Sequence, residues 1–322
     1  MEKQKNRSRL RTVMRWVVWV LVVQLLLINI SAALYAYKFT HLYDNGRSPA
    51  PVSQNFLAKT WRLFAGPRFY KLPAIEQPSF RYDSVSLHTK NKKRIDAWYN
   101  QIDSGIAKGT VILFHGLTGN KTTILQQANE FRYWGYNVML IDSRSHGNSD
   151  GNSTTIGFRE SEEVKLAFDY AKQRGQEKIY LWGFSMGAVQ ILKAVADYEL
   201  KPAGVILEMP FGTLQSHIKR RMNSIGFPKQ PFGFLITFWI GVEKGFNGFS
   251  FNTVKYAKQL NCPALIQYGS RDQLVDKDDV KAIYEAVPST NKKLIEYVGA
   301  NHEPFLVKNP ELWRKEVGEF LK

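Results

Sequence analysis

From about residue 80 onward, short runs of apolar residues alternate with longer stretches that have helical spacing. The runs TVILFH, YNVMLID, KIYLWGF, AGVILEM and ALIQYG show no polar face. Strands that are apolar on both sides are typical of a mostly parallel sheet covered by helices on both faces. The sequence therefore predicts an α/β fold. In such folds ligands bind beyond the carboxyl ends of the strands.

The ends of this region complete the predicted sheet. VSLHT and RIDAWY alternate like the two strands of a hairpin, while KKLIEYV is the expected last strand. The segments TTILQQANEFRYW, residues 158–174, MGAVQILKAVADY and PELWRKEVGEFL have the spacing of helices.

The pentapeptide GFSMG at residues 183–187 joins the predicted strand KIYLWGF to the predicted helix MGAVQILKAVADY. It matches the G-x-S-x-G elbow, in which a serine occupies a sharp turn from strand to helix. Glycines two residues to either side remove Cβ atoms that would clash in that turn. The motif predicts that Ser185 is a nucleophile.

A serine hydroxyl needs a general base, and in this kind of site the base follows the serine and the acid along the chain. His217 and His302 are the histidines after Ser185. His217 lies in the basic segment SHIKRR and is expected to be solvated or interfacial. His302 follows the last strand, and we predict that it is the base. His115 precedes Ser185 and is expected to order its loop.

The acid of the site is expected to orient the histidine and to stabilise its charged form. Asp272 follows the strand ALIQYG directly, within GSRDQLV, and is our choice. Asp276, Asp278 and Asp279 are expected to open the next helix, where acidic residues favour the N-terminus. Glu208, at the end of AGVILEM, is the alternative acid.

An oxyanion formed at Ser185 needs preorganised donors. We expect them to be the backbone N–H groups of Met186, the residue after the nucleophile, and of Leu117, in the loop after TVILFH. The loop DSRSHGNSDG, residues 142–151, either lines the site or braces the elbow, and it receives no catalytic role. The sequence contains no metal-ligand cluster and no phosphate-binding glycine loop, so no cofactor is expected.

Residues 16–37 form a run of 22 uncharged residues with aromatic residues near both ends. Such a run is long enough to cross a bilayer as a helix. The basic tail before it, residues 1–15, is expected to stay in the cytoplasm, with the catalytic domain on the other side. A cleaved signal peptide is the alternative, but its apolar region would be shorter. Residues 38–80 are expected to be a juxtamembrane connector, with FLAKTWRLFAGPRFYK either near the membrane surface or packed on the domain.

The net charge of +16 fits an anionic membrane surface as well as nucleic acid. The chain shows neither zinc-ligand spacing nor an RNA-binding signature, so no nucleic-acid partner is expected. Cys262 is the single cysteine of the sequence. It excludes an intrachain disulfide, and we expect a small buried side chain.

The segments FHGLTGN, DSRSHGNSDG, GFSMG, GSRDQLV and NHEPF occur in this order over residues 81–322. Together they resemble the α/β-hydrolase superfamily, in particular membrane-anchored bacterial serine hydrolases and the BEM46-like group. The resemblance implies a triad of Ser185, Asp272 and His302, with Leu117 and Met186 as oxyanion donors. Ser145 stands where the family usually has glycine.

An insertion at about residues 211–260 is rich in phenylalanine and is expected to cap the site. A cap beside a membrane anchor favours a lipid or another small acyl substrate, although these aromatic residues equally fit the core of the cap. The expected activity is hydrolysis of a carboxylic ester. The alternatives are a peptidase or thioesterase with the same triad, and a noncatalytic membrane-tethered binding protein. The sequence leaves the oligomeric state open.

Overall fold

The computed structural model describes residues 2–44, 56–103 and 105–322. Part of the predicted connector, residues 45–55, therefore lies outside the described residues. The strands are β1 Leu42–Tyr43, β2 Phe69–Tyr70, β3 Asp83–His88, β4 Arg94–Asn100, β5 Thr110–Phe114, β6 Asn137–Ile141, β7 Ile179–Phe184, β8 Gly204–Glu208, β9 Ala264–Gly269 and β10 Lys292–Tyr297.

The main sheet has eight strands within the described part of the chain, in the order β10-β9-β8-β7-β5-β6-β4-β3. β3 and β4 form an antiparallel hairpin, and β4 is antiparallel to β6. All the strands from β6 across to β10 are parallel to one another. The predicted α/β fold with a mostly parallel sheet is confirmed.

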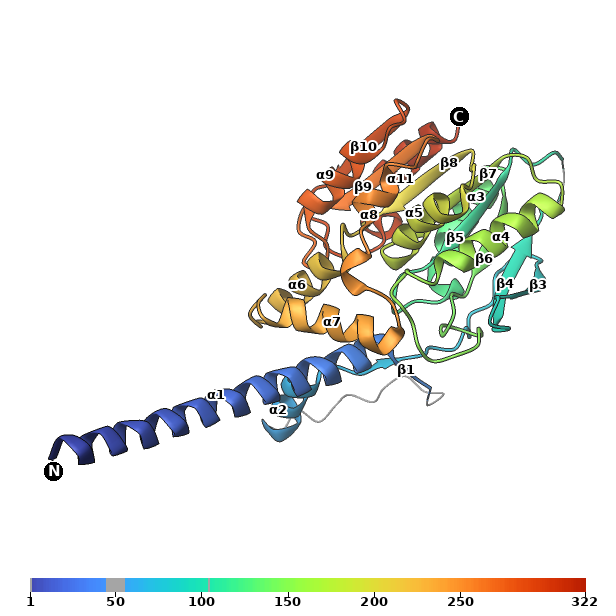
Figure 1. The fold of residues 1–322 in the computed structure, drawn as a ribbon. Coiled ribbons are helices and arrows are strands. Elements are labelled where there is room, and N and C mark those ends of the chain that lie inside the picture. Colours follow the sequence, from blue (N-terminus) through green and yellow to red (C-terminus); the bar gives the residue numbers. More distant parts are fainter. Residues whose placement is uncertain (1, 45–55, 104) are drawn as a thin grey trace.

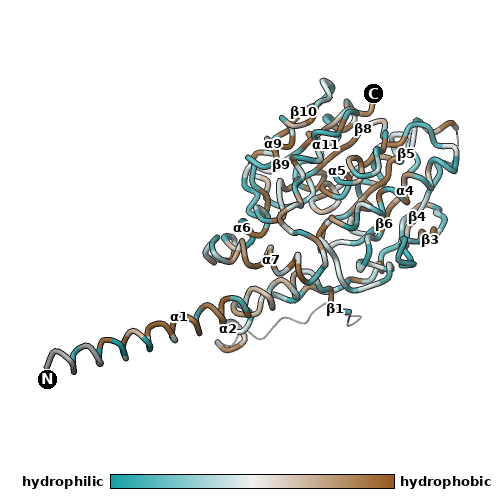
Figure 2. The backbone as a smooth tube through the Cα atoms, viewed as in Figure 1, coloured by the Kyte–Doolittle hydropathy of each residue, from teal (hydrophilic) through white to brown (hydrophobic). Residues whose placement is uncertain are grey.

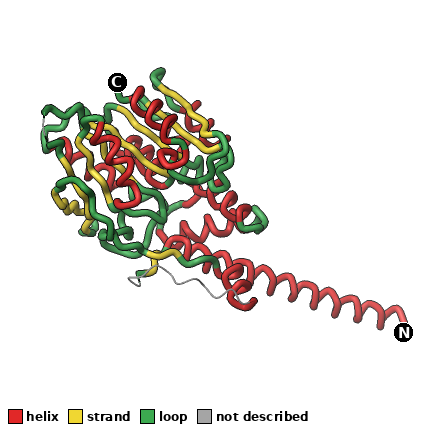
Figure 3. Tube along the Cα trace, turned by 180° about the vertical axis from the view of Figure 1, so that it is seen from behind, coloured by secondary structure: helices red, strands yellow, loops and turns green. Residues whose placement is uncertain are grey.

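Helices cover both faces of this sheet, as seen from the front and from behind (Figure 1, Figure 3). α4 and α5 pack together, and α3 and α11 are joined by the stacked rings of Trp134 and Trp313. The helices are α1 Glu2–Thr40, α2 Phe56–Ala65, η1 Lys121–Ile124, α3 Leu125–Tyr133, α4 Ser161–Gln173, α5 Met186–Tyr198, α6 Leu214–Ser224, α7 Phe232–Lys244, η2 Gly248–Ser250, α8 Thr253–Ala257, α9 Lys277–Ala286, α10 Phe305–Lys308 and α11 Pro310–Phe320.

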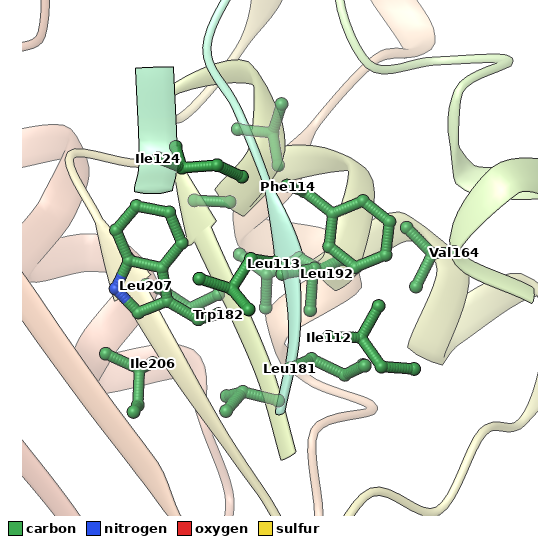
Figure 4. Packing of buried hydrophobic residues seen from close by; sticks show 14 of the residues in the cluster. Ile112, Leu113, Phe114, Ile124, Val164, Leu181, Trp182, Leu192, Ile206 and Leu207 are labelled. Atoms are coloured by element: carbon green, nitrogen blue, oxygen red, sulfur yellow. The ribbon is translucent and has the colours of Figure 1, made fainter. Parts of the chain in front are cut away.

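The core lies between the central strands and their helices. The side chains of Ile112 and Leu113 on β5 and of Leu181 and Trp182 on β7 are fully buried (Figure 4). Because every residue of β5, β6, β8 and β9 is buried, the central strands are apolar on both faces, as the sequence pattern requires.

Helix α1 is long and divides into two parts. Its large hydrophobic side chains from Leu10 to Ile30 are mostly exposed, and the helix protrudes from the domain (Figure 1, Figure 2). Among the described residues it is the one helix long and apolar enough to cross a membrane, over Arg9–Thr40. The last turns of α1 are buried instead, since Ala32, Ala36 and Phe39 are fully buried. The end of α1 is therefore part of the folded domain.

The end of α1 lies between the cap and the connector. It packs side by side with α7, which lies in the predicted cap, on one side and with α2 on the other (Figure 1). The Ser31 hydroxyl donates to the Phe64 carbonyl at the end of α2 at 2.5 Å. On α2, Leu57 and Trp61 stay exposed. The connector thus packs on α1 and also presents an apolar surface beside it.

We predict that Phe39→Ala lowers the free energy of unfolding by about 3 kcal/mol, because a fully buried ring is removed from a packed interior. The measurement is urea unfolding of the full chain in detergent, followed by tryptophan fluorescence. Leu21→Ala is the matched control, since Leu21 is 57% exposed on the same helix. Equal stability of the two variants would show that the end of α1 does not belong to the core.

Candidate active site

The turn between β7 and α5 places Ser185 in a strained backbone conformation, with φ 53° and ψ −112°. Close packing makes the flanking glycines necessary. A Cβ atom on Gly187 would lie 2.2 Å from the Phe114 carbonyl oxygen, and one on Gly183 would lie 2.5 Å from the Gly187 carbonyl carbon. The Ser185 N–H donates to the Glu208 carbonyl at the end of β8 at 2.8 Å. These contacts fix the turn that the motif predicts.

Ser185, His302 and Asp272 form a hydrogen-bonded series. The Ser185 Oγ lies 3.0 Å from His302 Nε2, and His302 Nδ1 lies 2.8 Å from Asp272 Oδ2. An ionised carboxylate only accepts hydrogen bonds, so Nδ1 carries the proton and Nε2 of the neutral ring accepts from the serine. The structure thus brings together the three residues singled out by the sequence. Their catalytic roles stay a prediction.

The loop after β9 holds the Asp272 carboxylate in place. Its second oxygen, Oδ1, accepts the N–H groups of Leu274 at 2.7 Å and Val275 at 2.9 Å. Arg220 of the cap donates to the Asp272 carbonyl oxygen at 2.7 Å. With one oxygen occupied by backbone donors, the other is directed to His302. Asp276 caps α9, as predicted, by accepting the N–H of Asp278.

Glu208, the alternative acid, does not reach the histidine. Its fully buried carboxylate accepts hydrogen bonds from Trp182 Nε1 at 3.0 Å and from Trp313 Nε1 at 2.7 Å. It also accepts the N–H of Phe305 at 3.5 Å. Burial raises the pKa of Glu208 to about 7, although these donors act in the opposite direction. Glu208 therefore joins β7, β8 and the C-terminal helices beneath the site.

Of the two expectations for His217, the solvated position is wrong and the interfacial one is confirmed. The side chain is buried, stacks on Phe211 with ring centroids 4.6 Å apart, and lies 3.2 Å from the Leu274 carbonyl through Nδ1. α6 turns its apolar side, with Leu214 and Ile218, toward the domain, and His217 shares that side. Burial, together with the nearby positive charge of Arg221, lowers the pKa of His217 to about 3. His217 is thus an uncharged side chain in the wall of the cavity.

Two further histidines order the loops around the elbow. His115 Nδ1 lies 2.7 Å from the Gly116 carbonyl, and its Nε2 accepts the Ser143 N–H at 3.1 Å. Burial lowers the pKa of His115 to about 3, so the ring is neutral. His146 Nε2 lies 2.5 Å from the Leu117 carbonyl. The expectation that His115 orders its loop is confirmed, and His146 positions the Leu117 peptide.

The loop of residues 142–151 contributes none of the described residues that line the site, and its Ser143 hydroxyl lies 3.4 Å from Gln190 Oε1 on α5, the helix that follows the elbow. Ser145 adopts φ 70°, a conformation that glycine enters more easily, and its hydroxyl donates to the Ser153 carbonyl at 2.8 Å. That hydrogen bond offsets the strain at the position where the family usually has glycine.

Leu117 and Met186, the expected oxyanion donors, both lie next to Ser185. Leu117 lines the same cavity as Ser185. Met186 is the first residue of α5, where an N–H group has no partner within its own helix. This placement leaves both N–H groups suited to an oxyanion, a role that stays a prediction.

The cavity above Ser185 has a volume of about 270 Å³. It is lined by glycines and apolar side chains together with a few polar groups: Gly116, Leu117, Thr118, Gly119, Thr123, Ile124, Gln127, Trp182, Phe184, Ser185, His217, Arg221, Leu274, His302 and Pro304. A carboxylate is absent from this set of described residues. The cavity is near the lower end of ligand-pocket sizes, so it encloses the group at the reacting bond and not a whole lipid.

Cys262 lies outside this cavity and is half-buried. Burial raises the pKa of its thiol to about 12, so the thiol stays protonated and unreactive.

Glu208 makes the stability of the protein depend on pH. Between about pH 4.5 and 7 the folded protein keeps a proton on Glu208 that the unfolded chain has lost. Its contribution to the free energy of unfolding therefore falls as pH rises through this range, by about 3 kcal/mol. We predict that Glu208→Gln removes this fall, measured by urea unfolding at pH 4.5 and pH 8. Glu311→Gln, on the exposed side of α11, is the control and should keep it.

A family model described as serine aminopeptidase, S33, matches residues 105–229 and 248–308. Among curated relatives, the Bacillus subtilis protein YqkD is 26% identical over 216 residues, which cover 66% of this chain and 70% of that protein. The membrane protein YNL320W of Saccharomyces cerevisiae is 23% identical over 230 residues, which cover 71% of this chain and 76% of the relative.

Among solved structures, the Pyrococcus furiosus esterase Pf2001 is 27% identical and superposes with a TM-score of 0.65. The match covers 79% of this chain and 96% of the esterase. An esterase from Exiguobacterium antarcticum shares the fold at 16% identity and a TM-score of 0.57, over 74% of this chain and 100% of that one. The chain therefore belongs to the serine aminopeptidase S33 family of α/β-hydrolases and is a hydrolase.

Proposed function

We propose that this protein is a membrane-anchored serine esterase that cleaves a carboxylic ester through an acyl-enzyme intermediate. The observation that carries the proposal is the series in which Ser185 Oγ lies 3.0 Å from His302 Nε2 and His302 Nδ1 lies 2.8 Å from Asp272. Neutral His302 is positioned to take the serine proton, and Asp272 to stabilise the imidazolium that results.

In the proposed reaction, the Ser185 Oγ attacks the ester carbonyl carbon while its proton passes to His302 Nε2. The Leu117 and Met186 N–H groups hold the oxyanion of the tetrahedral intermediate. His302 then returns the proton to the leaving alcohol, and the C–O bond breaks to give an acyl-Ser185 ester. Water then attacks this ester while His302 takes its proton. The bond from the acyl carbon to Ser185 Oγ breaks, His302 returns the proton to Ser185 Oγ, and the carboxylic acid is released.

The cavity favours an ester over the substrate of an aminopeptidase. An aminopeptidase must bind the positively charged N-terminus of a peptide, and a buried cation needs a carboxylate partner. The described residues that line this cavity include no carboxylate, and they do include the cation Arg221. Because the family model is described as serine aminopeptidase, peptide hydrolysis is the second candidate.

The surface beside α1 supports an acyl substrate that comes from a membrane. Phe234, Phe238 and Val242 on α7 and Phe249 on η2 are 39% to 55% exposed. α7 packs along the end of α1, and η2 packs against α7. The exposed part of α1, from Leu10 to Ile30, is about 30 Å long, the thickness of a bilayer core. This arrangement holds the cap close to the membrane surface.

We predict that the purified protein hydrolyses p-nitrophenyl esters faster than aminoacyl anilides and reacts with a fluorophosphonate probe. Ser185→Ala should abolish the labelling. Asp272→Asn should lower kcat by about 10³- to 10⁴-fold, because the amide no longer holds His302 in the reactive tautomer. Labelling at a serine other than 185 would contradict the assignment.

Asp276→Asn is the matched control for Asp272→Asn. It removes a charge four residues away, and asparagine caps a helix as well as aspartate does. Its kcat should stay within a few fold of that of the unchanged protein. If correctly folded protein neither reacts with the probe nor hydrolyses esters, a noncatalytic binding protein becomes the better explanation.

The basic N-terminal flank predicts that the catalytic domain lies outside the cytoplasm. A reporter enzyme that is active only outside the cytoplasm, fused after Lys322, should be active, and a cytoplasm-dependent fluorescent reporter at the same place should be dark. The opposite pattern would place the domain in the cytoplasm.

A further inference from the structure

Arg221 is a cation in the wall of the cavity for which the proposed reaction has no use. It lies on α6 of the cap, one turn after His217, and both side chains line the cavity of Ser185. His302 lines the same cavity. Arg221 is therefore close to the reacting groups but separate from them.

Aromatic side chains of the anchor helix and the connector hold Arg221. Its guanidinium carbon lies 4.9 Å from the ring centroid of Phe39 on α1 and 4.8 Å from that of Phe69 on β2. The Tyr35 hydroxyl of α1 also lies beside it. The face of an aromatic ring attracts a guanidinium. The N–H groups, which point outward in the plane of the guanidinium, stay free for other partners. We call Tyr35, Phe39 and Phe69 the aromatic socket.

The aromatic socket contains no negative charge to balance Arg221. Among the described residues, no carboxylate lies within ion-pair distance of its guanidinium, whereas Arg220, the preceding residue, pairs with Asp276 at 3.7 Å. Burial lowers the pKa of Arg221, yet a guanidinium stays charged at neutral pH. A partly buried cation without a counter-charge is costly, and an anion that enters the cavity would remove that cost.

We propose that Arg221 determines substrate specificity by binding an anionic group, a carboxylate or a phosphate, that the ester carries close to its reacting bond. This inference rests on the proposed esterase function and names its substrate class. The planar guanidinium offers paired N–H donors that match either anion. Since two of the three socket residues lie on α1, the anchor helix also builds this part of the binding site.

The test compares two soluble esters of similar length, neutral p-nitrophenyl butyrate and the anionic mono-p-nitrophenyl ester of glutaric acid. The measured quantity is the ratio of kcat/KM for the anionic ester to that for the neutral ester. The unchanged protein should prefer the anionic ester. Arg221→Met should lower the ratio by about 10- to 100-fold, as expected for loss of a charge-assisted hydrogen bond to the anionic ester.

Lys219→Met is the matched control, because it removes one positive charge from the same helix at a residue that does not line the cavity. Its ratio should equal that of the unchanged protein. Arg221→Lys keeps the charge but loses the fork geometry, and its ratio should lie between the two, which provides a test if Arg221→Met does not fold. An unchanged protein that prefers the neutral ester, or an Arg221→Lys ratio that does not fall, overturns the proposal.

A second pair of substrates tests whether the anionic group belongs to a lipid headgroup or to a soluble ester. Monoacylglycerol and monoacylglycerol phosphate with the same acyl chain are presented in identical detergent micelles. If Arg221→Met reduces cleavage of the phosphate lipid alone, the anion is a lipid headgroup. If only the glutarate ester is affected, the substrate is a soluble anionic ester. If the unchanged protein neither hydrolyses any of these esters nor reacts with the probe, the esterase function itself is contradicted.

Discussion

The start of α5 approaches the ends of β5 and β7 so closely that no side chain fits at positions 183 and 187. A Cβ on Gly187 would lie 2.2 Å from the Phe114 carbonyl oxygen. This close contact holds Ser185 at a positive φ, a strain of about 1–3 kcal/mol that persists because the surrounding packing imposes it. The serine hydroxyl then lies at the carboxyl edge of the sheet, where the loops after β5 and β9 begin. The site depends on this one contact between helix and strand backbones.

The loops that surround the serine are braced by a buried ion pair. Lys121 Nζ is fully buried and lies 2.5 Å from Asp142 Oδ2 and 2.9 Å from Asp96 Oδ1. The same carboxylate of Asp142 accepts the Asn148 N–H at 2.8 Å. Removing one partner of such a pair leaves an uncompensated buried charge, so the pair ties the loop after β6 firmly to η1. Through His146 this rigid loop also holds the Leu117 carbonyl.

Local sequence patterns were enough to predict the strands, the elbow and the residues that meet there. The apolar runs indicate the central strands, because a strand buried on both faces does not alternate polar and apolar residues. The glycines of GFSMG indicate a tight turn in which larger side chains would clash. The burial of His217 was not predictable in the same way. The basic residues of SHIKRR suggest solvent, and only the packing of α6 on the domain shows which side of the helix faces inward.

The packing of the last turns of α1 was also not predictable from the sequence. An uncharged run predicts a membrane span, but it carries no sign that its last turns pack against a cap some 200 residues away. Those turns bury Ala32, Ala36 and Phe39, and Phe39 in turn faces Arg221 in the wall of the cavity. A helix that merely tethered the enzyme would not need buried side chains at this end. Because α1 carries an exposed apolar stretch at one end and packs against Arg221 of the cavity wall at the other, the predicted membrane span is joined directly to the site.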